Sequence, residues 1–560
     1  MKWTTSLRFG VVLVFCLTTV GHARLPAAAI ASAHPLATDA GFEVMDQGGN
    51  AFDAAVAVSA ALAVVEPFGS GMGGGGFWLL HQADGGRNLM IDGREAAPAA
   101  ASRDMYLDNR GQVVRDWAIN GPAAAAIPGQ PAALAHLASR YGKLPLSTSL
   151  APAIRLASEG FPVNEHYRRM ALMRRDALTR SVEARRIFLN NGEVPPLDHL
   201  VVQTDLATLL TLLADQGHDG FYRGELAQKL VDGVIDNGGL WSIEDLANYR
   251  VVERDPVVGT FRGARIISAA PPSSGGVVLI QTLNMLERFN DGRIDPALLP
   301  HLAVEAMKRA YRDRAVYLGD PDYVEMPLDR LLDKQYATRS AASIRLDLAT
   351  PSSSLGEPLT VEQGNHTSHF SIIDQQGNRV AATLSINLPF GSGFVVPGTG
   401  LLLNNEMDDF SANPGSPNAY GLIGGEANAI APGKRPLSSM TPTFVEWDGN
   451  VAILGTPGGS RIISMVMLGI LDALDGKTPA EWVARPRFHH QYLPDKVEGE
   501  PDFVGTAAGK ALLVRGHEVE STGRRYGNMQ AILWHGRLKT LEAVSDPRGG
   551  GKALVRATGK

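Results

Sequence analysis

The sequence predicts a protein of the α+β class, because helical and strand-like patterns occupy different parts of the chain. Residues 150–250 and 301–317 carry the apolar spacing of amphipathic helices, with a clear apolar stretch at 206–213. From Thr367 to about Gly459, short alternating segments and turn residues dominate instead. Such a separation of helices from strands is typical of α+β proteins.

Composition narrows the class of protein further. The 560 residues include 44% hydrophobic and 20% charged residues, which is a globular balance, and the length alone suggests three or four domains. The net charge of −6 provides no basic surface for nucleic acid. The single cysteine, Cys16, excludes an internal disulfide and a cysteine-rich metal site. A large enzyme or binding protein remains.

Residues 1–23 have the pattern of a secretory signal peptide. Lys2 and Arg8 supply its positive end, and the apolar run 10–20 is too short to span a bilayer. A buried N-terminal helix is the alternative interpretation. Cleavage would remove Cys16, and no later segment reaches the ~18 apolar residues of a membrane span. We expect an exported protein, periplasmic or secreted, that is free of the membrane after cleavage.

A predicted helix and strand flank a glycine cluster near the N-terminus. Asn50 can cap a helix that has Asp53 in its first turn and ends near Val65. The glycine-rich residues 69–76 follow, and 77–80 are strand-like. The cluster fits G-x-G-x-x-G, but a dinucleotide site needs a strand before it and a helix after it. The order here is reversed, which argues against such a site.

The chain changes character after the helix predicted at 301–317. Residues 340–365 lack a regular apolar pattern, and their segment PSSSLGEP has the composition of a surface loop. The shift near 350–366 is the most plausible boundary in the chain.

A β-hairpin is predicted around the turn sequence DQQGN. A three-residue loop that ends in glycine favours a hairpin, since that position needs the left-handed conformation. Pairing Asp374 with Asn378 places Thr367 opposite Ser385, although a bulge could shift this by one residue. Ser385 and Asn387 then share a face, because side chains alternate along a strand. Two hydroxyls and an amide would meet at one strand end, a grouping that ordinary cross-strand pairing also produces.

Other catalytic signatures are missing from the sequence. There is no G-x-S-x-G motif, and no cysteine remains for a thiol mechanism after signal cleavage. The histidine pairs His366/His369 and His489/His490 lack the carboxylate–histidine spacing of a metal site. We therefore expect no metal and no organic cofactor.

From about Ala29 to Arg548 the chain resembles the gamma-glutamyltransferases (gamma-glutamyltranspeptidases). The matching blocks are long and in order: HPLATDAGFEVMDQGGNAFDAAVA (34–57), GMGGGGF (71–77), DGREAAP (92–98), NHTSHFS (365–371), LLNNEMDDFS (402–411), KRPLSSMTPT (434–443), GTPGGSRII (455–463) and RPRFHHQ (485–491). The resemblance implies an N-terminal-nucleophile hydrolase with a four-layer αββα sandwich.

The resemblance also implies a precursor that cuts itself between His366 and Thr367. A large subunit, 24–366, and a small catalytic subunit, 367–560, would then stay together as a heterodimer that forms one intertwined domain. The Thr367 hydroxyl attacks the preceding carbonyl, and water hydrolyses the resulting ester. The freed α-amine has an ordinary pKa of roughly 7.7–8.0, so it can serve as the base for its own hydroxyl. The uncut chain should be inactive.

Further roles follow from the resemblance by position. Gly458 and Gly459 match the oxyanion hole, because backbone N–H groups without side chains can approach the developing charge. Arg94 matches the clamp on the substrate α-carboxylate, which a guanidinium grips through two hydrogen bonds. Positions that match groups around the α-carboxylate or the α-amine, or that assist Thr367, are Ser438, Ser439, Asn387, Glu406, Asp409 and Ser385.

The chain departs from the family at two of these positions. Ser385 stands where threonine is common, and Glu406 stands where many bacterial members have glutamine. Residues 412–433 match a lid loop over the γ-glutamyl pocket, with Tyr420 at its closing position.

The expected activity is the cleavage of γ-glutamyl amides such as glutathione through a γ-glutamyl-threonine ester. Water, an amino acid or a peptide would then accept the acyl group. A glutaryl-cephalosporin acylase or a polyglutamate transpeptidase of the same family is the alternative, but a glutaryl group lacks the α-amine that Asp409 and Glu406 would hold. An exported protein that binds γ-glutamyl compounds without cutting them is a second alternative, against which Thr367 and the Gly458–Gly459 pair argue.

Overall fold

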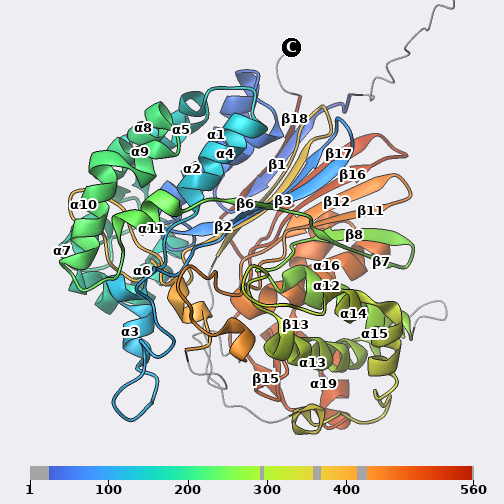
Figure 1. Cartoon of the computed structure of the whole chain (residues 1–560). Helices are drawn as coiled ribbons and strands as arrows, with labels where there is room; N and C mark the ends of the chain where they lie inside the picture. The colour runs from blue at the N-terminus through green and yellow to red at the C-terminus, as the bar shows by residue number, and fades with distance from the viewer. Residues whose placement is uncertain (1–23, 290–294, 357–366, 413–424, 558–560) are drawn as a thin grey trace, which may run out of the picture.

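Two antiparallel β-sheets lie face to face between two layers of helices (Figure 1). The computed structural model describes residues 24–289, 295–356, 367–412 and 425–557. The αββα sandwich and the α+β class expected from the sequence are confirmed.

The first sheet has seven strands, which alternate between distant parts of the chain. In spatial order they are β18 (Lys552–Arg556), β1 (Ala28–Ser32), β9 (Ser368–Ile373), β10 (Arg379–Ser385), β2 (Gly75–Gln82), β3 (Arg87–Gly93) and β6 (Val252–Arg254).

The second sheet has six strands and packs on the first. In spatial order they are β17 (Thr540–Ser545), β16 (Gln530–His535), β12 (Asn450–Gly455), β11 (Thr443–Trp447), β8 (Ala264–Ser268) and β7 (Val257–Phe261). Two small sheets lie outside the sandwich: β13 (Phe488–His489) with β14 (Val497–Gly499) and β15 (Val519–Ser521), and β4 (Phe161–Pro162) with β5 (Leu200–Val201).

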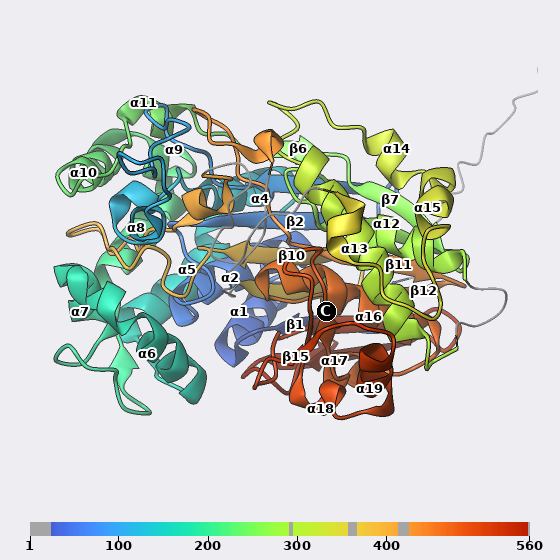
Figure 2. The ribbon, with the colours of Figure 1, turned by 90° about the horizontal axis from the view of Figure 1, so that it is seen from below.

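One helical layer, with the helices that extend it, lies on the side of the first sheet. Its members are α1 (Pro35–Asp46), α2 (Ala51–Val65), α3 (Arg115–Ile119), α4 (Gln130–Arg140), α5 (Leu146–Glu159), α6 (Glu165–Arg180), α7 (Val182–Phe188), α8 (Thr204–Gln216), α9 (Asp219–Tyr222), α10 (Gly224–Ile235) and α11 (Ile243–Asn248). In the view from below, α6, α7 and α10 lie on one side of the strands, and α14, α15 and α19 lie on the other (Figure 2).

The second helical layer covers the second sheet. It contains α12 (Gly275–Glu287), α13 (Leu299–Tyr317), α14 (Leu328–Leu332), α15 (Lys334–Ala341), α16 (Ile462–Leu474), α17 (Pro479–Ala484), α18 (Pro501–Val504) and α19 (Ala507–Val514). Short 3₁₀ turns complete the chain: η1 (Pro122–Ala124), η2 (Ser352–Leu355), η3 (Glu406–Asp409), η4 (Glu426–Asn428) and η5 (Gly459–Arg461). Within the described residues, no helix has both the length and the apolar character that crossing a bilayer requires.

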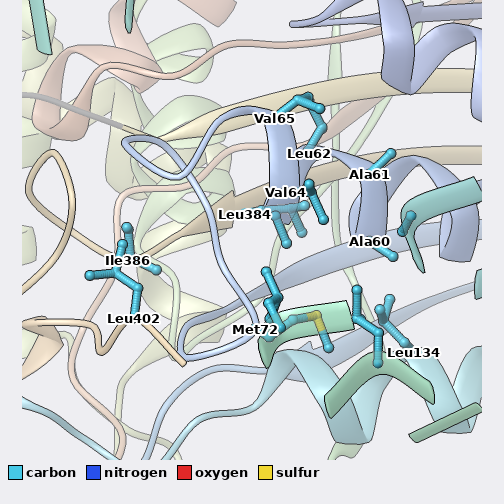
Figure 3. Close-up of a cluster of buried hydrophobic side chains, with 14 of the residues drawn as sticks. Ala60, Ala61, Leu62, Val64, Val65, Met72, Leu134, Leu384, Ile386 and Leu402 are labelled. Atoms are coloured by element: carbon cyan, nitrogen blue, oxygen red, sulfur yellow. The ribbon is translucent and has the colours of Figure 1, made fainter. Parts of the chain in front are cut away.

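Apolar side chains fill all three interfaces between the layers. Ala31, Ile373 and Ile453 belong to the core between the two sheets. Between the first sheet and its helices, α2 contributes Ala60 to Val65 opposite Leu384 of β10 and near Leu134 of α4 (Figure 3). Every residue of α2 is buried, as expected of a helix that is apolar almost all round. Burial on this scale is the main source of stability for the sandwich.

The helix and hairpin predictions are confirmed in detail. Asn50 caps α2, and its backbone N–H donates to Asp53 Oδ2 at 2.9 Å in a capping box. The hairpin β9–β10 has the predicted register, since Asp374 N–H donates to Asn378 O at 3.0 Å and Ser368 pairs with Leu384. Thr367, one residue before β9, therefore lies opposite Ser385. The helices predicted at 206–213 and 301–317 are α8 and α13.

The expectation of strands throughout 367–459 is partly wrong. No named strand occurs in the described residues between β10 and β11, where loops and short 3₁₀ turns run instead. Asn387 adopts φ +69°, so the alternation predicted for Ser385 and Asn387 stops at the end of β10. The chain turns there, and a turn rather than a strand face sets the position of the Asn387 side chain.

Glycines 73–76 let three segments approach one another closely. A Cβ added at Gly74 would lie 2.1 Å from Ser385 O, and one added at Gly73 would lie 2.0 Å from Leu402 O. Such contacts are impossible for any other residue without a backbone shift. The cluster thus has a packing function at the start of β2, consistent with the sequence argument against a dinucleotide site.

Candidate active site

Thr367 stands at the end of the β9–β10 hairpin and faces the loop that follows β12. Its Oγ1 accepts a hydrogen bond from Gly458 N–H at 3.2 Å. Gly458 and Gly459 have φ of +146° and +57°, which are accessible to glycine at little cost. This turn at the start of η5 directs backbone N–H toward the threonine hydroxyl. A carbonyl attacked by that hydroxyl would have a backbone donor within reach.

A narrow pocket opens beside Thr367 and collects most of the predicted site residues. Its lining is Thr367, Ser385, Asn387, Asp409, Leu437, Ser438, Ser439, Met440, Gly459, Ser460 and Ile462. Thr367 directly precedes β9, and Ser385 is the last residue of β10. The other lining residues come from the segment between β10 and β11 and from the start of η5 and α16 after β12, so segments next to both sheets contribute. Arg94 and Glu406 are not part of the lining. His366 and Tyr420 lie outside the described residues.

Ser385 and Asn387 form one side of this pocket. The backbone N–H of Asn387 donates to Ser385 Oγ at 2.7 Å, and the Asn387 side-chain amide donates to Asn405 O at 2.9 Å. Both side chains are almost fully buried. Their hydrogen bonds hold the end of β10 against the segment that carries η3.

Arg94 is buried directly behind Asp409 and is surrounded by carboxylates. Its guanidinium lies 2.5 Å from Asp409 Oδ2, 2.7 Å from Glu406 Oε2 and 3.4 Å from Glu95 Oε2. Its Nε also donates to Pro436 O at 3.1 Å. Of the three acids, only Asp409 has a side chain with appreciable exposure, at 12%. In this uncut form, the guanidinium that was expected to bind substrate therefore forms ion pairs with the protein's own acids.

Burial dominates the electrostatics of this cluster. Desolvation raises the pKa of Glu406 well above its usual range, although Arg94 opposes the shift. Desolvation likewise raises the pKa of Glu95 to about 7, again against the pull of Arg94. For Arg94, burial works to lower the pKa, but Glu406, Asp409 and Glu95 together raise it. One guanidinium thus faces three acids, and burial drives two of them, Glu406 and Glu95, toward the protonated form.

Ser438 and Ser439 close the opposite side of the pocket. Ser438 Oγ accepts from Met440 N–H at 3.0 Å, and Ser439 Oγ accepts from Arg314 at 3.4 Å. Arg314 also donates to Ser274 Oγ at 2.9 Å, and burial lowers its pKa to about 10. A cation behind Ser439 was not foreseen from the sequence, because Arg314 lies on α13 and no local pattern links it to the serines.

Glu66, a buried acid near Thr367, was also not foreseen from the sequence. Ser368 Oγ donates to Glu66 Oε2 at 2.7 Å, and Glu66 is buried at the C-terminal end of α2. Desolvation raises the pKa of Glu66 to about 7, which the hydrogen bond from Ser368 counteracts only in part. The only sequence signal was an acid directly before Pro67, at the end of an apolar helix.

We expect Glu66→Gln to remove a component of the pH dependence of stability. The folded protein disfavours the ionised carboxylate, so this group's stabilising contribution is present below about pH 4.5 and is lost as the pH rises to about 7. Relative to the variant, the free energy of unfolding of the wild type should fall by about 3 kcal/mol between these two pH values. Urea unfolding midpoints at pH 5 and pH 7.5 measure the difference. Glu43→Gln, at an exposed ion pair with Arg155, is the control and should leave the pH dependence unchanged. Equal pH dependence in wild type and Glu66→Gln would contradict the assignment.

Among the described residues, no group of three or more histidine, cysteine, aspartate or glutamate side chains is arranged to hold a metal ion. His369 and His489 are instead buried within the protein, and burial lowers the pKa of both.

A four-layer sandwich whose first sheet ends at a threonine hydroxyl, with a glycine N–H directed at that hydroxyl, is the arrangement of an N-terminal-nucleophile hydrolase. A sequence model of the gamma-glutamyltranspeptidase family matches residues 37–556. The chain belongs to this family and is an enzyme.

Relatives with two different names match nearly the whole chain. The glutathione hydrolase proenzyme of Escherichia coli (strain K12) is 42% identical over 525 residues, which is 93% of this chain and 90% of that protein. The acylase ACY 1 proenzyme of Pseudomonas sp. (strain SE83) is 37% identical over 512 residues, covering 90% and 89%. A crystal structure of cephalosporin acylase from Bacillus halodurans aligns with a TM-score of 0.83 at 29% identity, covering 99% of this chain and 98% of that one.

Proposed function

We propose that this protein is the precursor of a gamma-glutamyltransferase that cleaves γ-glutamyl amides such as glutathione. The observation that carries the proposal is the pocket at Thr367, with Asp409 in its wall and Arg94 directly behind. An acid and a guanidinium in contact match the ammonium and the carboxylate of an α-amino acid. The 42% identity to the glutathione hydrolase proenzyme of Escherichia coli, against 37% to the acylase ACY 1 proenzyme, supports the same choice.

The precursor would first cut itself between His366 and Thr367. Thr367 Oγ1 attacks the carbonyl carbon of His366, the C–N bond breaks, and the acyl group moves to oxygen. Water then hydrolyses this ester and leaves a free α-amine on Thr367. The products, 24–366 after loss of the signal peptide 1–23 and 367–560, remain together as a heterodimer. They would stay joined because strands of the two products pair within both sheets: β1 lies between β18 and β9, β10 pairs with β2, and β11 pairs with β8. The signal peptide would direct the protein out of the cytoplasm.

In the mature enzyme the same hydroxyl would attack the γ-carbonyl of the substrate. The α-amine takes the proton from Oγ1 and delivers it to the leaving nitrogen. The N–H groups of Gly458 and Gly459 stabilise the oxyanion. A γ-glutamyl ester forms on Thr367 as the amine departs. Water or the amine of an acceptor then attacks the ester carbon, the C–O bond to Thr367 breaks, and the hydroxyl regains its proton.

Substrate recognition would rearrange the acid cluster. The α-carboxylate would take the place of Asp409 on Arg94, and Asp409 with Glu406 and Asn387 would turn to the α-ammonium. Ser438 and Ser439 would donate hydrogen bonds to the carboxylate. This exchange keeps each buried charge paired, which buried charges require.

Because some relatives are named acylases, a glutaryl acylase is the second candidate function. A kinetic comparison distinguishes it from a gamma-glutamyltransferase. We expect kcat/KM for γ-glutamyl-p-nitroanilide to exceed that for glutaryl-p-nitroanilide by about 10²-fold, since the glutaryl group lacks the charged partner of Asp409. Release of p-nitroaniline measures both rates on the processed enzyme. Equal or faster use of the glutaryl amide would overturn the proposed function in favour of the acylase.

A further inference from the structure

A second cavity opens on the other side of Thr367 and has a volume of about 280 Å³. Its lining is Glu66, Phe68, Gly69, His166, Arg169, Met170, Thr367, Pro457, Gly458, Arg524, Arg525, Tyr526, Gly527, Asn528 and Arg548. It shares Thr367 with the first pocket, and Gly458 in its wall is the direct neighbour of Gly459 in the wall of the other. The two cavities therefore meet at the reacting atoms.

Because the two cavities meet at Thr367, each can hold a different part of a substrate that is bonded to this residue. When a carbonyl carbon is bonded to Thr367 Oγ1 and its oxygen faces the glycine N–H groups, two directions remain for its substituents. The acyl chain lies in the first pocket, where Asp409 and Ser438 can reach its α-groups. The amine side of the amide then extends into the second cavity, and an acceptor amine must approach the ester carbon from the same place.

The charges of the second cavity are unevenly paired. Arg548 is held by Glu500 at 2.7 Å, and Arg525 is held by Asp502, with Nε at 2.7 Å from Oδ2. Arg169 contacts His166 Nδ1 at 2.9 Å, and within the described ranges neither Arg169 nor Arg524 forms an ion pair with a carboxylate.

The remaining titratable groups do not offset these two guanidiniums fully. Burial lowers the pKa of His166 to about 4, so this neighbour is neutral at pH 7. Glu66, at the inner end of the cavity, has its pKa raised to about 7 and already accepts the hydrogen bond of Ser368. Arg169 and Arg524 are both exposed at the mouth of the cavity, where a ligand can reach them. An anionic group would be attracted to this mouth.

We propose that the second cavity is the subsite for the leaving amine and for the acceptor, and that Arg169 and Arg524 select amines that carry a free carboxylate. Short peptides with an unblocked C-terminus have this chemistry. The reacting nitrogen lies next to Thr367, and the carboxylate lies at the mouth, where a guanidinium can bind it through two hydrogen bonds. This inference rests on the proposed γ-glutamyl transfer.

The test compares two acceptors that differ only in this charge. With γ-glutamyl-p-nitroanilide as donor, we measure kcat/KM for glycylglycine and for glycylglycinamide on the processed enzyme. The wild type should prefer glycylglycine, and the double variant Arg169→Gln/Arg524→Gln should reduce this preference about tenfold, as expected for two exposed charge contacts. Arg180→Gln is the matched control. It lies on the same helix α6, pairs with Asp116 outside the cavity, and should keep both the wild-type preference and the activity.

Ionic strength provides a second measurement that needs no variant. The preference of the wild type for glycylglycine should fall as salt is raised from about 0.05 to 0.5 M, because exposed charges are screened over a shorter distance. An unchanged preference in the double variant, or a wild type that does not distinguish the two acceptors at low salt, would overturn the subsite assignment. A wild type that releases no p-nitroaniline at all would instead refute the proposed function.

Discussion

Thr367→Ala is expected to leave the precursor as a single chain without detectable γ-glutamyl transfer. The variant has no hydroxyl to attack the His366 carbonyl, so neither the ester nor the free α-amine can form. Loss of nucleophile and base together should lower kcat/KM by at least about 10⁴-fold. A denaturing gel reports the cut, and p-nitroaniline release reports the activity.

Two controls make this result specific to the hydroxyl. Thr367→Ser keeps the nucleophilic oxygen and should still cut itself, whereas Ser368→Ala changes the adjacent hydroxyl, which is bonded to Glu66, and should also be processed. N-terminal sequencing of the small subunit should give Thr367 followed by Ser368, His369 and Phe370. The appearance of two subunits in Thr367→Ala would show that another residue performs the cut.

Arg94→Lys is expected to lower kcat/KM for γ-glutamyl-p-nitroanilide by about 10²-fold. Lysine retains the positive charge but cannot grip a carboxylate through two parallel hydrogen bonds, which corresponds to a loss of ~3 kcal/mol. Lysine is preferable to a neutral replacement, because Glu95, Glu406 and Asp409 would otherwise lose their shared buried cation.

A substrate without the α-carboxylate shows whether Arg94 acts on substrate or only on its acid neighbours. The matched substrate is γ-aminobutyryl-p-nitroanilide, which has the amine but not the carboxylate. The wild type should discriminate strongly between the two anilides, and Arg94→Lys should discriminate much less. If the variant slows both anilides equally, Arg94 serves to hold Asp409 and Glu406 in place, and the proposed clamp is wrong. A gel that shows normal processing confirms that the variant folds.

Local signals were sufficient for several parts of the fold. The start of α2 depends on Asn50 and Asp53, which are three residues apart, and the β9–β10 register depends on a turn of five residues. Interactions of such short range are encoded by neighbouring residues, so propensity and spacing predict them. The placement of Thr367 opposite Ser385 followed from that register. The strand β10 ends at Ser385, and strand alternation gave no signal of the left-handed turn at Asn387 that follows it.

Long-range contacts were accessible only through family resemblance or through the structure. Gly458 follows Thr367 by 91 residues, and Asp409 follows Arg94 by 315. No periodicity spans such distances, and the matching sequence blocks supplied the expectation that these residues cooperate. The resemblance also implied the αββα architecture, which the two sheets and their helical layers confirm.

The sequence by itself determined the family, the α+β class, the capped helix α2 and the hairpin that presents Thr367, because each depends on nearby residues or on long matching blocks. Only the tertiary structure decided which charges meet. It pairs Arg94 with three acids, places Glu66 against Ser368 and opens a second cavity between α6 and the loop after β15. These pairings arise where segments hundreds of residues apart are buried together. Burial then changes their protonation equilibria in ways that composition and spacing do not encode.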